Sequence, residues 1–113
     1  MAEPTRSERV MVQARPAKLE DAPSLQKNCL PANTLDEVKS FLEKDVEEMS
    51  RGNKVRLVAE INGEVIGNLE IFFSRHPLTF HIADISTVVV NPAFRRRGIA
   101  TRMIESALQI AEE

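Results

Sequence analysis

The dipeptide Asn62-Gly63 constrains this chain most, because it separates two segments in which polar and apolar side chains alternate. A two-residue hairpin turn needs positive φ at both positions, and Asn-Gly is the pair that adopts it most readily. The flanking segments, residues 54–61 and 64–74, have the period of two that is typical of β-strands. The sequence therefore predicts an antiparallel hairpin in the middle of the chain.

Two more strands are predicted around this hairpin. Residues 80–90 are dense in β-branched side chains, and residues 10–15 form a short alternating run before Pro16. Gly67, inside the second hairpin strand, marks a bulge or the close approach of another element. The central strands thus form an antiparallel meander, preceded by one further strand.

Three helices complete the prediction. The first covers residues 19–29, with a proline in its early turns, and the last begins near Gly98. The second is indicated most clearly, because Thr34 and Glu37 have the spacing of a capping box. It carries one apolar face and ends at Arg51-Gly52. The apolar face expected for the last helix consists of Ile99, Met103, Ile104, Ala107, Leu108 and Ala111.

Composition excludes several classes of protein. Fifteen basic and 17 acidic side chains in 113 residues give a net charge of −2, which argues against a nucleic-acid partner. Cys29 is the only cysteine, so neither an internal disulfide nor a thiolate metal cluster is expected, and two histidines indicate no metal site. The sequence has no signal-peptide pattern and no apolar run that would cross a membrane. We therefore expect a cytoplasmic protein without a membrane partner.

The predicted fold class is α/β, of the α+β kind: a mainly antiparallel sheet flanked by helices, in the order β-α-α-β-β-β-α. A single domain is expected over residues 10–113, after a disordered leader at residues 1–9.

The segment most informative about chemistry links the last strand to the last helix. It reads Val88-Val89-Val90-Asn91-Pro92-Ala93-Phe94-Arg95-Arg96-Arg97-Gly98-Ile99-Ala100-Thr101. A glycine-bearing turn that opens a helix binds anions, because unpaired backbone N–H groups converge there and the helix dipole adds positive potential. Three arginines beside the turn strengthen that field. The segment is neither a nucleotide-hydrolase phosphate loop nor a dinucleotide fingerprint, because the lysine and the further glycines of those motifs are absent.

Residues 95–100 fit the pattern Gln/Arg-x-x-Gly-x-Gly/Ala, and here the sequence resembles the GNAT superfamily of acetyl-CoA-dependent N-acetyltransferases. The resemblance extends over residues 10–113 through the order of elements, the hairpin Asn-Gly-Glu-Val-Ile-Gly and the strand that ends Val-x-Val-Asn-Pro. It implies acetyl-CoA as co-substrate, no metal, and transfer of the acetyl group to a primary amine of a small molecule or a protein.

The resemblance also implies a binding site for the coenzyme. The main chain of Val88, Val89 and Val90 would pair with the pantetheine arm like an added strand, and the amide of Val88 or Val90 would polarise the thioester carbonyl. The pyrophosphate cradle would comprise Arg95, Arg96, Arg97, Gly98, Ile99, Ala100 and Thr101. Each arginine has the alternative of being a solvated surface charge.

The family often places a carboxylate upstream on the same strand, which here is Asp84. Alternation puts Asp84, Ser86, Val88 and Val90 on one face, so Asp84 would act as general base and Ser86 would hold a water molecule. Because an aspartate ionises at about 3.9 when free, this role would need a raised pKa or a water relay. The alternative is that Asp84 pairs with an arginine or lysine of a neighbouring strand.

The sequence departs from the family at its end. The chain stops at Glu113, before the C-terminal strands of a complete GNAT domain, and it contains no tyrosine to protonate the departing thiolate. The strand over residues 80–90 would then expose an open edge, through which a homodimer could form. The alternative function is a non-catalytic acyl-CoA-binding or regulatory module.

Overall fold

The computed structural model describes residues 12–73, 83–95 and 98–112. Its strands are β1 (Gln13–Pro16), β2 (Lys54–Ile61), β3 (Glu64–Phe73) and β4 (Ala83–Val90). Its α-helices are α2 (Ala22–Asn28), α3 (Leu35–Ser50) and α4 (Ile99–Glu112), and two 3-10 turns are η1 (Leu19–Asp21) and η2 (Pro92–Phe94). The predicted order of strands and helices is confirmed. The leader at residues 1–9 and the predicted start of the last strand at residues 80–82 lie outside the described residues.

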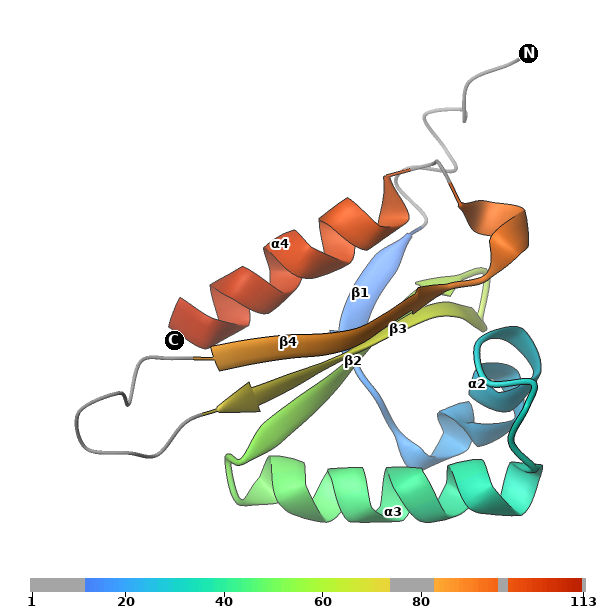
Figure 1. The fold of residues 1–113 in the computed structure, drawn as a ribbon, viewed down its shortest axis with the longest axis horizontal. Helices are drawn as coiled ribbons and strands as arrows, with labels where there is room; N and C mark the ends of the chain where they lie inside the picture. Colours follow the sequence, from blue (N-terminus) through green and yellow to red (C-terminus); the bar gives the residue numbers. More distant parts are fainter. Residues whose placement is uncertain (1–11, 74–82, 96–97, 113) are drawn as a thin grey trace.

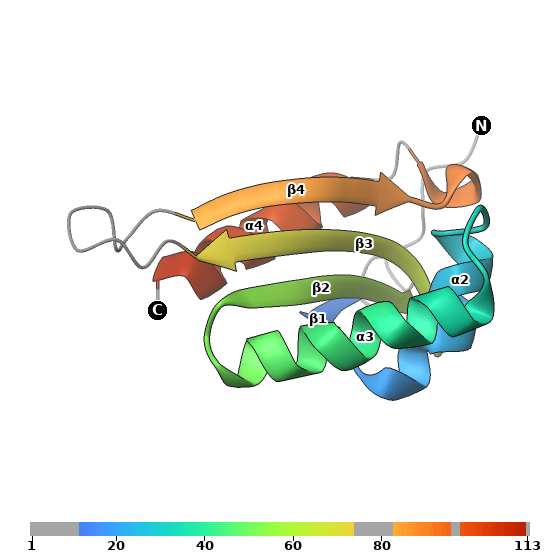
Figure 2. The same ribbon diagram turned by 60° about the horizontal axis from the view of Figure 1, so that its bottom comes forward.

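The sheet has the order β1-β2-β3-β4, and every neighbouring pair is antiparallel. Helix α4 covers one face, and α2 and α3 cover the other (Figures 1 and 2). Two clusters of buried side chains correspond to these faces. One contains Met103 and Ala107 of α4, and the other contains Leu25 of α2 with Val38 and Leu42 of α3. The α+β fold class is therefore confirmed.

Local sequence signals account for the ends of these elements. Asn62 and Gly63 have φ angles of 51° and 83°, which the predicted hairpin turn requires. At the start of α3, Thr34 Oγ1 accepts from the Glu37 N–H at 3.1 Å, and Glu37 Oε1 accepts from the Thr34 N–H at 2.8 Å. The helix predicted from Leu19 begins instead as a 3-10 turn and becomes α-helical at Ala22, with a proline in its first turn.

Helix α4 packs closely on the sheet at Gly67. A Cβ atom at Gly67 would lie 2.9 Å from Met103 Sδ, so the predicted close approach is confirmed. The predicted apolar face of α4 is too wide, since Leu108 is 52% exposed while Ala107 is buried. The line that contacts the sheet runs through Ile99, Met103 and Ala107, and Leu108 is turned about 100° away from it. The side chain of Ala111 lies outside the described residues.

The predicted alternation along β4 is wrong beyond Ser86. Ser86 lies opposite Glu70 and Val89 lies opposite Asn68, so Thr87 and Val88 share one partner position on β3. This bulge reverses which face later side chains occupy. Val90 consequently packs in the α4-side cluster, whereas Ser86 and Asp84 lie on the α3 side.

Among the described residues, no helix is long and apolar enough to cross a membrane.

Candidate functional site

A pocket lies where β4 ends and α4 begins. Its volume is about 210 Å³, and it opens to solvent. The lining residues are Val90, Phe94, Arg95, Gly98, Ile99, Ala100 and Thr101. All of them except Phe94 were predicted to belong to the coenzyme site. The pocket therefore joins the end of a strand, the turn after it and the first turn of a helix.

Gly98 shapes the turn into α4 through its backbone. Its φ is 75°, in the left-handed region that glycine adopts without strain, and a Cβ atom there would meet nothing within 4 Å. The Arg102 N–H donates to the Gly98 carbonyl at 3.0 Å, which begins the hydrogen bonding of the helix. The N–H groups of Ile99, Ala100 and Thr101 precede that bond, at the helix end where the dipole is positive.

Asn91 supports the turn, and sequence reasoning missed this role. Its backbone N–H donates to the Ile66 carbonyl at 2.8 Å and its Nδ2 donates to the Asn28 carbonyl at 2.9 Å. Its Oδ1 accepts from the Ala93 N–H at 2.9 Å. The Asn-Pro dipeptide was the available signal, because asparagine before proline favours the start of a turn. These bonds fix the end of β4 to β3 and α2.

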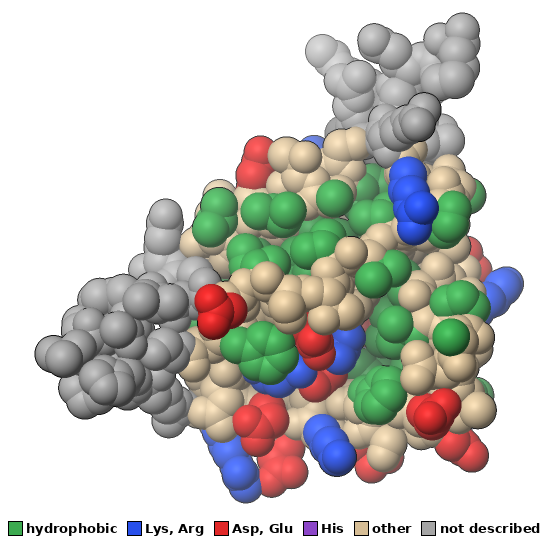
Figure 3. Space-filling model, viewed as in Figure 1, with side chains coloured by type: hydrophobic (Ala, Val, Ile, Leu, Met, Phe, Trp, Pro, Cys, Tyr) green, Lys and Arg blue, Asp and Glu red, His purple; other side chains and the backbone are tan. Residues whose placement is uncertain are grey.

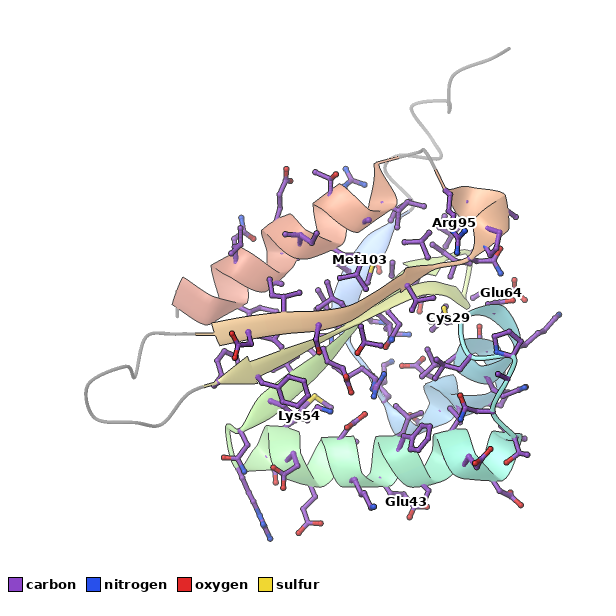
Figure 4. The ribbon with its side chains drawn as sticks, in the orientation of Figure 1. Cys29, Glu43, Lys54, Glu64, Arg95 and Met103 are labelled. Atoms are coloured by element: carbon purple, nitrogen blue, oxygen red, sulfur yellow. The ribbon has the colours of Figure 1, made fainter. Side chains whose placement is uncertain are left out.

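Arg95 is the one motif arginine whose place is described, and it lines the pocket. Figure 4 shows it beside the turn that follows β4. Its Nε donates to the Val90 carbonyl at 3.1 Å. The guanidinium is thereby held beside the end of β4, with its other N–H groups able to reach an anion. Arg96 and Arg97 lie outside the described residues.

The two predicted catalytic side chains stand together on β4. Asp84 is exposed and lies opposite Phe72, while Ser86 lies opposite Glu70. No ion pair within the described residues involves Asp84, which leaves its carboxylate open to solvent there. The bulge separates both from Val90, which faces the other side of the sheet. Of the predicted coenzyme residues, Val90, Arg95 and residues 98–101 line one pocket, whereas Val88 and Val89 do not line it and the predicted base lies on the α3 side.

Strand β4 is an edge strand of the described sheet. β4 has no hydrogen-bonded neighbour beyond β3 in the described sheet, and Val88 is 41% exposed. Such an edge presents main-chain N–H and C=O groups to an added strand or an extended ligand.

Comparison with solved structures shows the same fold. A GNAT-family acetyltransferase from Streptococcus pneumoniae is 23% identical with a TM-score of 0.69, covering 88% of this chain and 66% of that chain. A GNAT acetyltransferase from Staphylococcus aureus is 14% identical with a TM-score of 0.77, covering 90% and 78%. PaiA N-acetyltransferase from Thermoplasma acidophilum, in complex with coenzyme A, is 14% identical with a TM-score of 0.63, covering 89% and 72%.

This chain spans about two thirds of the length of the first two structures it matches. No curated protein sequence matches it. The model of the acetyltransferase (GNAT) family matches residues 19–113, which include every helix and every strand but β1. The chain therefore belongs to the GNAT acetyltransferase family.

Proposed function

We propose that the chain binds acetyl-CoA and transfers its acetyl group to a primary amine. The observation that supports this most directly is the pocket at Gly98. It joins a helix N-terminus, a glycine with positive φ and an arginine at the end of an edge strand. Backbone N–H groups and positive potential at such a place suit the pyrophosphate of the coenzyme.

The remainder of acetyl-CoA would extend along β4. The exposed edge at Val88 supports pairing between the pantetheine amides and the main chain of the strand. In this arrangement, the N–H of Val88 or Val90 donates to the thioester oxygen, where negative charge develops during attack. The coenzyme supplies a thioester that an amine can attack without a metal or a covalent enzyme intermediate.

The amine would approach from the α3 side, on which Asp84 and Ser86 lie. Asp84 takes a proton from the ammonium form, through a water molecule held by Ser86. The amine nitrogen then bonds to the carbonyl carbon and the carbon–sulfur bond breaks. The nitrogen gives up its second proton as the amide forms, and the departing thiolate takes up a proton, so the transfer to the free amine is neutral in protons. The exposed carboxylate, without an ion-pair partner in the described ranges, supports this role for Asp84.

Binding of the coenzyme is tested by Gly98→Glu, measured by calorimetric titration of the chain with CoA. We expect binding to be lost, since a carboxylate would stand where the pyrophosphate belongs. Gly63→Glu is a matched control, because Gly63 also has positive φ and open space but does not line the pocket. Binding that survives Gly98→Glu, or that falls equally in both variants, would refute the cradle.

The base is tested by Asp84→Asn, with acetyl transfer followed across pH. We expect turnover to fall mainly at low pH, where more of the amine is protonated, while affinity for CoA stays unchanged. Turnover equal to that of the unmodified chain at every pH would show that Asp84 is not the base.

A second candidate function is a module that binds acyl-CoA without transfer. The position of Asp84 supports this alternative, because Asp84 lies on the α3 side of β4 whereas Val90 packs on the α4 side. Tight CoA binding without turnover across a panel of amines would identify it.

The open β4 edge also supports a homodimer, which sedimentation with and without CoA would detect. The cytoplasmic location stays a prediction.

A further inference from the structure

Thr87 has an unusual backbone conformation at the bulge of β4. Its φ is +54°, although a β-branched residue rarely adopts the left-handed region. Such a conformation persists only when its surroundings enforce it, and it is concentrated at functional sites. Thr87 directly precedes Val88, whose main chain is proposed to meet the thioester.

One side chain on the neighbouring strand holds Thr87 in place. Thr87 Oγ1 donates to Glu70 Oε2 at 3.1 Å. The other carboxylate oxygen, Glu70 Oε1, accepts from Lys54 Nζ at 2.9 Å and from Arg56 Nη2 at 2.5 Å. The two oxygens of Glu70 therefore have different partners. Oε1 binds two side chains of β2, and Oε2 binds the bulge residue Thr87.

The cations that bind Glu70 are themselves fixed. Lys54 Nζ donates to Asp45 of α3 at 2.7 Å, and Arg56 Nε donates to the same carboxylate. Arg56 Nη1 also donates to Asn68 Oδ1 at 2.8 Å. Asp45, Lys54 and Arg56 are all buried, and Figure 4 shows Lys54 between the sheet and α3. Each of the two carboxylates binds both cations, so the network holds the Glu70 carboxylate in one position.

The network comes to the surface beside the proposed site. Figure 3 shows acidic and basic side chains side by side between β4 and α3. Glu70 lies opposite Ser86, which is itself 3.4 Å from Thr87 through their hydroxyl oxygens. The Glu70 carboxylate thus contacts the bulge on the α3 side of the sheet, the side from which the amine is proposed to approach.

We infer that Glu70 is a positioning residue for the thioester-binding segment. Its Oε2 holds Thr87 in the left-handed conformation, and this directs the main chain of Val88 toward the open edge of the sheet. The inference rests on the proposed function. The competing explanation is that the bulge follows from strand geometry alone and the hydroxyl contact is incidental.

Three substitutions at Thr87 separate these explanations. Thr87→Val keeps the branched shape but removes the hydroxyl, so the bulge should change conformation. Thr87→Ser keeps the donor, and Thr87→Gly needs no donor because glycine adopts positive φ without strain. We therefore expect the serine and glycine variants to resemble the unmodified chain and the valine variant to differ.

The conformation is measured by NMR on the whole chain, through the backbone shifts of Thr87 and the amide exchange of Val88. These should move in Thr87→Val and stay close to the original in Thr87→Ser. If Thr87→Val does not fold, Thr87→Ala, which also lacks the hydroxyl, replaces it. Signals unchanged in the folded variant without the hydroxyl would overturn the inference.

The consequence for catalysis is measured by steady-state acetyl transfer with one fixed amine. Loss of an oxyanion donor lowers kcat by about 100-fold or more, so misplacement of Val88 should lower kcat roughly 10- to 100-fold. The KM for acetyl-CoA should rise by a smaller factor than kcat falls, because Val88 supplies only part of the proposed pairing with the pantetheine arm, and Thr87→Ser should restore kcat. If the unmodified chain binds no CoA, the proposed function itself fails. If it binds and turns over but Thr87→Val does so equally well, only the positioning role of Glu70 fails.

Discussion

Replacement of Gly67 by alanine tests how α4, which begins at the proposed coenzyme pocket, is held against the sheet. The new Cβ atom would lie 2.9 Å from Met103 Sδ and 3.2 Å from the Ala59 Cβ atom. Both separations are well below the usual contact distance of about 3.5–4.0 Å between nonbonded carbon atoms. Since Gly67 does not have positive φ, the conflict is one of packing alone.

The size of the effect follows from two opposing contributions. Overpacking of a well-filled core costs about 1–3 kcal/mol, and the methionine can move its flexible end while the alanine cannot. Alanine restricts the unfolded chain more than glycine does, and this raises the free energy of unfolding by about 0.4–1 kcal/mol. We therefore expect Gly67→Ala to lower the free energy of unfolding by about 1–2 kcal/mol.

A double-mutant cycle shows whether Met103 is the cause. Met103 is fully buried, so Met103→Ala alone should cost about 2–5 kcal/mol. In the double variant the new methyl group occupies space that the methionine has left. The loss of unfolding free energy in the double variant should therefore be smaller, by about 1 kcal/mol, than the sum of the losses in the two single variants. Urea denaturation followed by circular dichroism gives all three values. Additivity within about 0.5 kcal/mol, or a Gly67→Ala variant as stable as the original, would refute this account of the contact.

The remaining predictions concern buried polar groups. Asp45→Ala leaves two buried cations with one carboxylate fewer, so the free energy of unfolding should fall by about 3–5 kcal/mol, measured by urea denaturation. Burial raises the pKa of Asp21, but hydrogen bonds from Arg15 and from a backbone N–H outweigh it, so the net pKa is lowered. Asp21→Asn should therefore be destabilising at pH 7, and the difference should shrink as pH falls below about 4 toward the lowered pKa of the folded state. Burial raises the pKa of Cys29 to about 11, so its thiol should react slowly with a disulfide reagent at pH 8 and rapidly in urea.

The elements of this fold were predictable where a local signal exists. The Asn62-Gly63 turn and the Thr34 cap depend on residues adjacent in sequence, and both were found as predicted. The pocket residues were also predictable, because the turn around Gly98 joins consecutive elements and its residues are close in sequence. Phe94 and Asn91 were missed, since Phe94 packs against the cluster of buried side chains under α4 and Asn91 binds the carbonyl of Asn28 in α2.

The bulge and the charge network were not predictable from local patterns. Thr87 gives no sign of positive φ, because threonine favours extended backbone, and its partner Glu70 is 17 residues away. The network joins α3, β2 and β3, so the polar alternation at Lys54 and Arg56 looks the same as that of a solvated strand face. Only the tertiary packing of α3 distinguishes the two.

The reversal at the bulge changes how the proposed reaction is arranged. With strict alternation, the side chains of Asp84 and Val90 would share one face, and amine and coenzyme would compete for it. The additional residue places Val90 among the side chains under α4 and leaves Asp84 on the α3 side. Coenzyme and amine can then reach the same strand edge from different sides, and the only shared surface is the main chain near Val88. Deleting Thr87 should keep Asp84 and Val90 on opposite faces, because Val88 alone would then lie opposite Leu69 in an unbroken ladder. Any fall in transfer in this variant would therefore come from the loss of the bulge at Val88 and not from a change in the side on which Asp84 lies.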